Sequence, residues 1–281
     1  MLLGTASWGN DYGLLNSRKL GISEAKVILR EALRAGINGI DTAPDYGDSE
    51  MVLGKSDLRP FRVFTKISQA TWSNELDRNS IQFRRSLSRL GLESAEGATF
   101  HSAESFLSTP TTSLELIESL KDAGLIKSWG VSVYSEEELI SILAVAAPDY
   151  IQAPVNLIDR RFLQPRIANL MEEKKCKLQA RSIFLQGLLL KNVETLPRFF
   201  QPLKELLSSH KWASREGQLT PYVSALLFVL MAEPVDTLVV GVNELEHLTE
   251  LTSAMKLTSV LPDFRHADSK EELYLVDPRN W

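Results

Sequence analysis

Short apolar runs and amphipathic stretches alternate along the whole chain. Eight runs of five or six residues have the length and composition of strands, and they lie at Leu2–Ala6, Ile37–Asp41, Arg62–Lys66, Gly97–His101, Ile126–Val131, Tyr150–Pro154, Lys177–Ser182 and Asp236–Val240. Strands that alternate with helices indicate a parallel sheet. Eight of them within 281 residues predict an α/β fold, a closed (β/α)8 TIM barrel, with residues 1–281 forming a single domain.

Apolar residues between the runs recur at the spacing of one helix face. Three such faces are Ala25-Ile28-Leu29-Ala32, Leu114-Ile117-Leu120 and Leu245-Leu248-Met255. Ser23 is the expected N-cap of the first helix and Gly36 its stop, while Gly124 ends the second. Asn243, followed three residues later by Glu246, resembles a capping box for the third.

Two segments fall outside this repeating pattern. The connection from residue 183 to residue 232 is longer than one helix requires and contains Pro197, Pro202 and Pro221. We therefore expect an extra short helix, or a lid over the site. The polar tail of residues 261–281 is compatible with disorder, with packing on the barrel and with a position at the barrel mouth.

Four polar residues stand at or just after the predicted strand ends. Asp41 ends the second run and Tyr46 follows it, Lys66 ends the third run, and His101 ends the fourth. Active sites of (β/α)8 barrels lie at the carboxyl ends of the strands. The fold therefore predicts that a carboxylate, a phenol, an ammonium and an imidazole meet in one cleft.

These four groups suit the reduction of a carbonyl compound. A phenol is a weak acid at neutral pH, and an ammonium beside it favours the phenolate and lowers its pKa. Tyr46 is expected to protonate the carbonyl oxygen, while Lys66 and His101 stabilise the charge that develops there. Asp41 is expected to hold Lys66 in place. None of the four can donate a hydride, so a cofactor must supply it.

The sequence around these residues resembles the aldo-keto reductase family. The segment from Asp41 to Glu50, followed by Leu53-Gly54-Lys55, is similar to the family's aspartate–tyrosine signature, and Lys66 and His101 stand where its lysine and histidine belong. Further similar segments follow in the family's order, at Gly130-Val131-Ser132, Gln152, Arg181-Ser182 and Val239-Val240-Gly241-Val242-Asn243. The resemblance spans roughly residues 2–260. It implies the same barrel and an NAD(P)H-dependent oxidoreductase that reduces an aldehyde or ketone, sugar-like ones included, to an alcohol.

The resemblance also implies a set of cofactor contacts. Ser132 and Gln152 would bind the nicotinamide carboxamide, and the Arg181 guanidinium would stack on the nicotinamide ring. The loop after the seventh strand would wrap the pyrophosphate with backbone amides, and the start of the last helix would hold the adenosine half. The complete expected set is Thr5, Asp41, Ser132, Gln152, Arg181, Ser182, Leu185, Gln186, Gly187, Gly241, Asn243 and Glu250.

The last of these segments departs from the family pattern. Family members often carry Lys or Arg there to bind the 2′-phosphate of NADP(H), whereas this chain has Gly241, Asn243 and His247, with Glu244 beside them. The resemblance favours NADP(H), and NAD(H) is the alternative. We expect NADPH to have a smaller advantage over NADH than an arginine contact would give. His247 itself is expected to be a solvated helix residue.

Substrate contacts are expected from the early loops and from the end of the sixth strand. The candidates are Trp8, Tyr12, Trp72 and Asn156. For the three aromatic residues, packing in the core is the alternative interpretation.

Composition narrows the classes of partner. The net charge of −5 and a pI near 5.5 argue against nucleic acid. One cysteine, Cys176, and four scattered histidines predict neither a disulfide framework nor a metal site. The longest apolar stretch, about residues 223–232, is too short to cross a bilayer, and no signal peptide precedes the first run. We expect a cytoplasmic enzyme acting on a small carbonyl compound, without membrane contact; the oligomeric state is not predicted.

Two other classes of protein compete with this interpretation. One is a cofactor-binding regulatory or subunit protein on the same barrel with little turnover; the intact cluster of four argues against it, because a binding module needs no acid. The other is a metal-dependent lyase or isomerase, which would need carboxylates and histidines clustered at strand ends. A metal analysis combined with a cofactor-oxidation assay separates the three.

Overall fold

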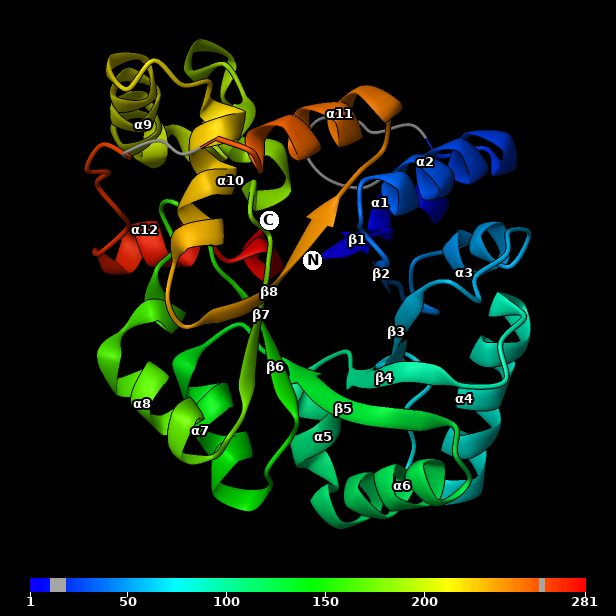
Figure 1. The fold of residues 1–281 in the computed structure, drawn as a ribbon. Coiled ribbons are helices and arrows are strands. Elements are labelled where there is room, and N and C mark those ends of the chain that lie inside the picture. Colours follow the sequence, from blue (N-terminus) through cyan, green and yellow to red (C-terminus); the bar gives the residue numbers. More distant parts are fainter. Residues whose placement is uncertain (11–18, 258–260) are drawn as a thin grey trace.

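Eight parallel strands close into a barrel in the computed structural model, which describes residues 1–10, 19–257 and 261–281 (Figure 1). The strands are β1 (Leu2–Gly4), β2 (Gly39–Asp41), β3 (Arg62–Ile67), β4 (Ala95–Phe100), β5 (Ile126–Ser132), β6 (Tyr150–Pro154), β7 (Lys177–Arg181) and β8 (Val235–Gly241). Each strand pairs with the next, and β8 pairs with β1. The predicted (β/α)8 barrel is confirmed, and the strand ends lie within two residues of their expected positions.

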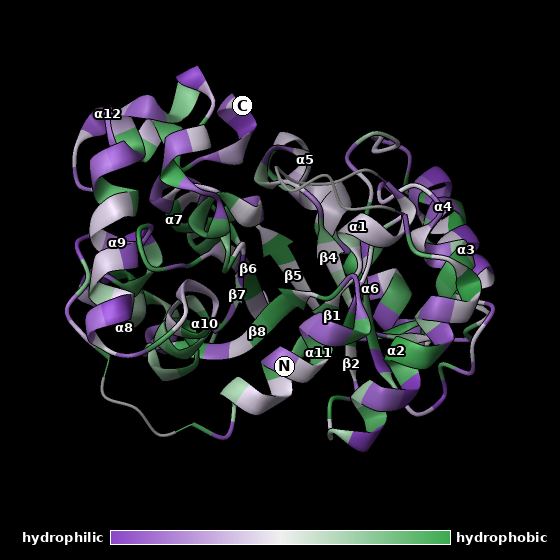
Figure 2. Cartoon of the chain, turned by 90° about the horizontal axis from the view of Figure 1, so that it is seen from above, coloured by the Kyte–Doolittle hydropathy of each residue, from purple (hydrophilic) through white to green (hydrophobic). Residues whose placement is uncertain are grey.

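Helices surround the strands in both views of the molecule (Figures 1 and 2). They are α1 (Ala6–Gly9), α2 (Ile22–Arg34), α3 (Ser49–Leu53), α4 (Leu76–Leu90), α5 (Ala103–Ser108), α6 (Pro110–Asp122), α7 (Glu136–Val145), α8 (Pro165–Glu173), α9 (Lys204–Glu216), α10 (Pro221–Met231), α11 (Leu245–Ala254) and α12 (Lys270–Leu275). Short 3-10 helices lie at η1 (Arg161–Leu163), η2 (Leu185–Leu190), η3 (Val193–Thr195), η4 (Arg198–Leu203) and η5 (Pro278–Asn280). Within the described ranges, no helix combines the length and the apolar character that spanning a membrane requires.

The apolar face of α2 packs as its spacing predicts, but two expected caps are wrong. The N-cap of α2 is Gly21, whose N–H donates to the Glu24 carboxylate, so Ser23 lies inside the first turn. The N-cap of α11 is Glu244 rather than Asn243. Asn243 is engaged elsewhere, because its side-chain oxygen accepts a hydrogen bond from the Ser7 hydroxyl. Because the Asn243 side chain bonds Ser7, it does not cap α11 as the local sequence pattern predicts.

An apolar layer fills the barrel beneath the predicted site. Leu2, Phe64, Tyr150 and Val239 form a separate buried cluster contributed by β1, β3, β6 and β8. Side chains two residues apart on a strand share a face, so Phe64 lies under Lys66 and Tyr150 lies under Gln152. The strands thus place a polar layer at their carboxyl ends directly above a buried, mainly apolar one.

The long connection between β7 and β8 contains the expected extra helix, α9, which precedes α10. The tail also packs: α12 contacts η4 on the side of the molecule that carries α9 (Figure 1), and Phe264, Leu275 and Val276 share a buried cluster with Phe200 and Leu206. Packing of the tail on the body of the protein is therefore the alternative that the structure supports.

A buried histidine, His210, packs against Phe264 of this cluster and should make the stability of the protein depend on pH. The His210 side chain is only 1% exposed, and neither of its ring nitrogens has a hydrogen-bond partner among the described residues. Burial, together with the charge of Lys211, lowers its pKa from 6.5 to about 4. The unfolded chain therefore takes up a proton first as the pH falls, so the stability present above pH 6.5 declines toward pH 4.

We expect the free energy of unfolding to fall by up to about 3 kcal/mol over this interval through His210 alone. Urea unfolding at a series of pH values measures the slope. A His210→Leu variant should lose that part of the slope, since leucine is apolar and does not titrate. An unchanged slope in the variant would contradict the assignment.

Candidate active site

The four residues predicted from the strand ends meet at the carboxyl side of the barrel. The Lys66 ammonium lies 2.7 Å from both carboxylate oxygens of Asp41, and 5.3 Å from the centre of the Tyr46 ring. The Tyr46 and His101 rings meet edge to face, with their centres 5.6 Å apart. The structure therefore assembles the expected carboxylate, phenol, ammonium and imidazole.

Tyr46 is held by a tight turn between β2 and α3. Its N–H donates to the carbonyl of Ala43, and its own carbonyl accepts from the N–H of Ser49. Gly47 adopts a left-handed backbone with φ of +57°. A Cβ on Gly9 would lie 2.0 Å from the Tyr46 carbonyl oxygen, so only glycine lets α1 approach this turn. Two glycines thus fix the position of the phenol.

The Lys66–Asp41 pair is almost completely buried, with side-chain exposures of 1% and 3%. Burial lowers the pKa of Lys66, and the adjacent Asp41 carboxylate opposes that effect by favouring the charged ammonium. Gln152 donates a further hydrogen bond of 2.8 Å to Asp41. The carboxylate is therefore satisfied by two groups and, in turn, supports a buried positive charge beside the phenol.

One charged residue of this cluster was not identified from the sequence. Asp45, the residue immediately before Tyr46, lies with one carboxylate oxygen 2.7 Å from His101 Nδ1, and its other oxygen accepts from the Ser68 hydroxyl. Burial alone would raise the pKa of Asp45, but the hydrogen bonds from His101 and Ser68 outweigh it and lower the pKa. Its place within the aspartate–tyrosine segment is the only signal that the sequence offered.

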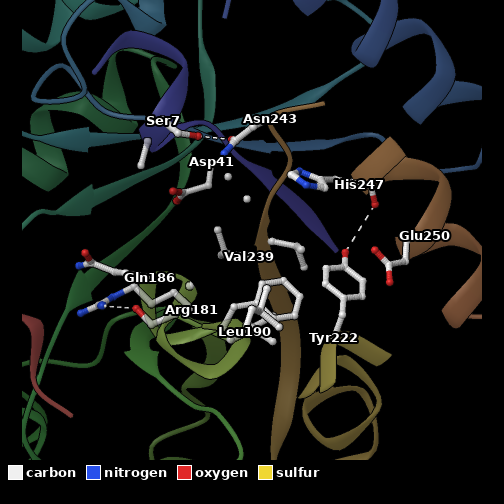
Figure 3. A pocket seen from close by; sticks show the side chains of 18 of the residues that line it. Ser7, Asp41, Arg181, Gln186, Leu190, Tyr222, Val239, Asn243, His247 and Glu250 are labelled. Atoms are coloured by element: carbon white, nitrogen blue, oxygen red, sulfur yellow. Dashed lines mark hydrogen bonds between the residues drawn. The ribbon is translucent and has the colours of Figure 1, made fainter. Parts of the chain in front are cut away.

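A cavity of about 430 Å³ begins at Asp41 and Tyr46 and extends to α11 (Figure 3). Its volume falls in the range of small-molecule and cofactor sites. Figure 3 shows Arg181 and Gln186 on one side of the cavity and Tyr222, His247 and Glu250 on another. The residues expected at the site that line the cavity are Asp41, Tyr46, Gln152, Arg181, Ser182, Gln186, Gly187, Gly241, Asn243 and Glu250.

Comparison with known proteins identifies the family of the chain. A model of the Aldo/keto reductase family matches residues 1–272. The chain belongs to the aldo/keto reductase family. Aldo-keto reductase YhdN of Bacillus subtilis is 34% identical over 146 residues, 47% of this chain and 44% of that protein. The NADH-specific methylglyoxal reductase of Escherichia coli is 26% identical over 213 residues, 67% of this chain and 64% of that protein.

The chain therefore spans less than two thirds of the length of both curated relatives. Among solved structures, the holo form of aldo-keto reductase AKR11C1 from Bacillus halodurans superimposes with a TM-score of 0.74 at 21% identity, covering 98% of this chain and 90% of that one. Glycerol dehydrogenase AKR11B4 from Gluconobacter oxydans gives a TM-score of 0.71 at 22% identity, covering 98% and 89%. These likenesses support the barrel fold of this family member.

The loop after β7 in this aldo/keto reductase has an unusual backbone. Ser182, Leu185 and Gln186 adopt φ values of 57°, 47° and 51°, and Gly187 has a φ of 91°. Left-handed conformations are costly for residues other than glycine, and they gather at ligand-binding loops. The loop borders the cavity through Ser182, Gln186 and Gly187, whereas Leu185 belongs to the buried cluster that contains Phe200 and Phe264.

Two further expected cofactor residues lie behind the cavity wall. Thr5 is fully buried, and its hydroxyl donates a 3.0 Å hydrogen bond to the carbonyl of Asp41. Ser132 is buried at the end of β5. Neither lines the cavity in the described structure. Thr5 therefore contacts the backbone of the site residue Asp41 and not the cavity itself.

Three of the four expected substrate residues, Trp8, Asn156 and Trp72, make contacts within the protein and do not line the cavity. Trp8 is 1% exposed, and its indole N–H donates to the carbonyl of Val242. Asn156 is fully buried and bonds the backbone of its own turn and of Ser182. Trp72 is half-buried, with its ring 5.3 Å from that of Phe100. Tyr12 lies outside the described residues.

Several residues that line the cavity come from the long connection between β7 and β8, where the sequence predicted only an extra short helix or a lid. The Tyr222 ring of α10 stacks on Phe184, with ring centres 4.6 Å apart and an angle of 20° between the planes. The Tyr222 hydroxyl reaches the backbone carbonyl of His247 at 3.5 Å. His247 was expected to be a solvated helix residue, yet it is partly buried and lines the cavity. Glu244 is exposed and does not line it in the described structure.

Proposed function

We propose that this aldo/keto reductase reduces an aldehyde or ketone to the alcohol with a nicotinamide dinucleotide, and that Tyr46 is the general acid. The observation that carries the proposal is the buried Lys66–Asp41 ion pair, 5.3 Å from the Tyr46 ring, at the end of a 430 Å³ cavity. A buried ammonium requires a paired carboxylate to remain charged. A module that only bound a ligand would gain nothing from a charged lysine held against a phenol.

Each residue then has a defined task. A carbonyl that accepts a hydride develops negative charge on oxygen, and Tyr46 would deliver a proton to that oxygen. The Lys66 ammonium stabilises the phenolate that remains, and Asp41 keeps the ammonium in place. His101 would hold the carbonyl oxygen opposite Tyr46 by a hydrogen bond.

The volume of the cavity and the polar residues that line it suit a nicotinamide dinucleotide. A bound nicotinamide dinucleotide supplies the hydride. Arg181 is held by hydrogen bonds to the Val133 carbonyl and the Ser182 hydroxyl, while its buried Nε has no partner among the described residues. An unsatisfied buried donor on a guanidinium suits a flat polar ring or a phosphate. Gln152, at the same end of the cavity, would bind the carboxamide.

A direct assay tests the proposal. The purified protein is incubated with NADPH or NADH and a panel of carbonyl compounds, and the loss of the reduced cofactor is followed by absorbance. The names of relatives suggest methylglyoxal for reduction and D-arabinose for the reverse reaction, since one relative is a methylglyoxal reductase and another a D-arabinose 1-dehydrogenase. Turnover that needs both cofactor and carbonyl supports the proposal; tight cofactor binding without turnover on any carbonyl would favour a regulatory protein.

Cofactor choice follows from the charges at the far end of the cavity. Arg181 is the only Lys or Arg among the described lining residues, and it lies on the other side of the cavity from His247 and Glu250 (Figure 3). A 2′-phosphate is normally met by Arg or Lys. We therefore propose that both dinucleotides bind, with only a small advantage for NADPH.

His247→Arg should raise the affinity for NADPH by about 10- to 100-fold, the worth of one hydrogen bond to a charged group. The affinity for NADH should stay within about twofold, because NADH has no phosphate to pair with the new charge. Titration of both cofactors by fluorescence quenching measures the change, with His247→Gln as the uncharged control. A strong NADPH preference in the unmodified protein, with no gain in His247→Arg, would show that the phosphate is bound elsewhere.

A further inference from the structure

The side chain of His101 is held by a carboxylate. Asp45 Oδ2 lies 2.7 Å from His101 Nδ1, and both side chains are about one quarter exposed. The carboxylate comes from the same turn as Tyr46, so one short segment positions the phenol and contacts the imidazole. With Nδ1 engaged, Nε2 is the ring nitrogen left to meet a substrate.

The protons around Asp45 determine which nitrogen of His101 carries hydrogen. An ionised carboxylate can only accept, whereas a protonated one could donate to the ring. Asp45 already accepts from the Ser68 hydroxyl and from the backbone N–H of Gln69. Both donors favour the ionised carboxylate. Burial raises the pKa of Asp45, whereas the hydrogen bond and charge of His101, together with the bonds from Ser68 and Gln69, lower it. His101 must therefore donate its Nδ1–H to Asp45.

This arrangement restricts what Nε2 can do. A neutral imidazole carries one proton, so a ring protonated at Nδ1 presents a lone pair at Nε2. That lone pair would repel a carbonyl oxygen. Only the imidazolium has a second N–H, at Nε2, with which to bind the oxygen.

We propose that Asp45 is a positioning residue that keeps the proton of His101 on Nδ1, so that His101 binds the substrate carbonyl only as an imidazolium. This inference rests on the proposed carbonyl reduction. His101 transfers no proton in the step; Tyr46 remains the acid. The imidazolium adds a full positive charge beside the oxygen, where a neutral histidine would supply only a weaker donor.

The charges around His101 are consistent with this role. Asp45 and Tyr46 approach the ring from the β2–α3 turn. Lys66, on β3, lies on the Tyr46 ring, and its charge is balanced by Asp41, on β2. The Asp45 carboxylate is therefore in direct contact with the imidazole, while the nearby ammonium is already paired with another carboxylate.

Proton positions on the ring can be read directly by NMR. In protein labelled with ¹⁵N-histidine, long-range ¹H–¹⁵N spectra distinguish the two neutral tautomers from the imidazolium. A His101→Gln variant assigns the His101 signals by their loss. We expect neutral His101 to be protonated at Nδ1, and in Asp45→Asn we expect a shift toward Nε2–H, since an amide can donate to Nδ1. Asp45→Glu should restore the Nδ1–H form, because a glutamate carboxylate can again accept from the ring.

Kinetics provide the matching functional readout. Asp45→Asn should lower kcat for carbonyl reduction by about 10- to 100-fold while the cofactor affinity is unchanged, and Asp45→Glu should restore part of the loss. An Nε2–H tautomer in the unmodified protein, or an unchanged Nδ1–H tautomer in Asp45→Asn, would overturn the inference. A protein that fails to reduce any carbonyl would refute the proposed function instead, and the tautomer measurement would still stand on its own.

Discussion

Tyr46→Phe should lower the turnover number for carbonyl reduction by about two to four orders of magnitude, the usual cost of losing a general acid. Phenylalanine keeps the ring that packs edge to face on His101 and lies 5.3 Å from the Lys66 ammonium. The turn that holds the residue depends on backbone hydrogen bonds and on Gly47, which the substitution leaves unchanged. The fold and the cofactor affinity should therefore be preserved.

Tyr150 offers a matched control for this substitution. Its hydroxyl is buried within the barrel and bonds the Thr99 hydroxyl at 2.8 Å, in the apolar layer beneath the site. Tyr150→Phe makes the same chemical change away from the cavity, and it should cost stability of about 1 kcal/mol with little loss of turnover. If Tyr46→Phe kept more than half of the turnover, with a deuterated cofactor showing that hydride transfer limits the rate, Tyr46 would not be the acid.

The barrel could be predicted because its signals are local and repeated. Each strand is a short apolar run, and because eight such runs alternate with helices, an error of two residues at the end of a strand does not change the predicted fold. The positions of Asp41, Lys66 and His101 followed from the parallel arrangement alone, since parallel strands bring their carboxyl ends together. The structure places all three in one cluster with Tyr46.

Other parts of the site depend on contacts between distant segments, which no local pattern reports. The Asp45–His101 hydrogen bond joins residues 56 positions apart, one in the turn after β2 and the other directly after β4. Trp8 looked like a pocket residue because it is a large aromatic in a loop, yet its indole N–H bonds Val242, far along the chain. Asn243 was assigned to a helix cap that its bond to Ser7 prevents. In each case a tertiary partner decided the outcome.

Lys66→Met should also cause a large loss of activity, of about two to three orders of magnitude, because it removes a charge that acts on the reacting oxygen through Tyr46. Methionine has nearly the length of lysine without the ammonium. An ammonium beside a phenol favours loss of the phenolic proton. Without it, the activity that remains should decline only at a higher pH than in the unmodified protein. Near-normal turnover with an unchanged pH profile would exclude Lys66 from the mechanism.

The single variant leaves the Asp41 carboxylate buried without its partner, and that alone could destabilise the protein by about 3–5 kcal/mol. The double variant Lys66→Met/Asp41→Asn removes both charges and should regain much of the stability measured by thermal unfolding, while the turnover stays low. Asp41→Asn alone separates the two roles: burial already lowers the pKa of Lys66, and without the carboxylate it should lower it further. Activity in that variant should then be lost at lower pH, the opposite direction to Lys66→Met. If the alkaline decline in activity moved in the same direction in Asp41→Asn and in Lys66→Met, the ion pair would only support the fold and would not act on the phenol.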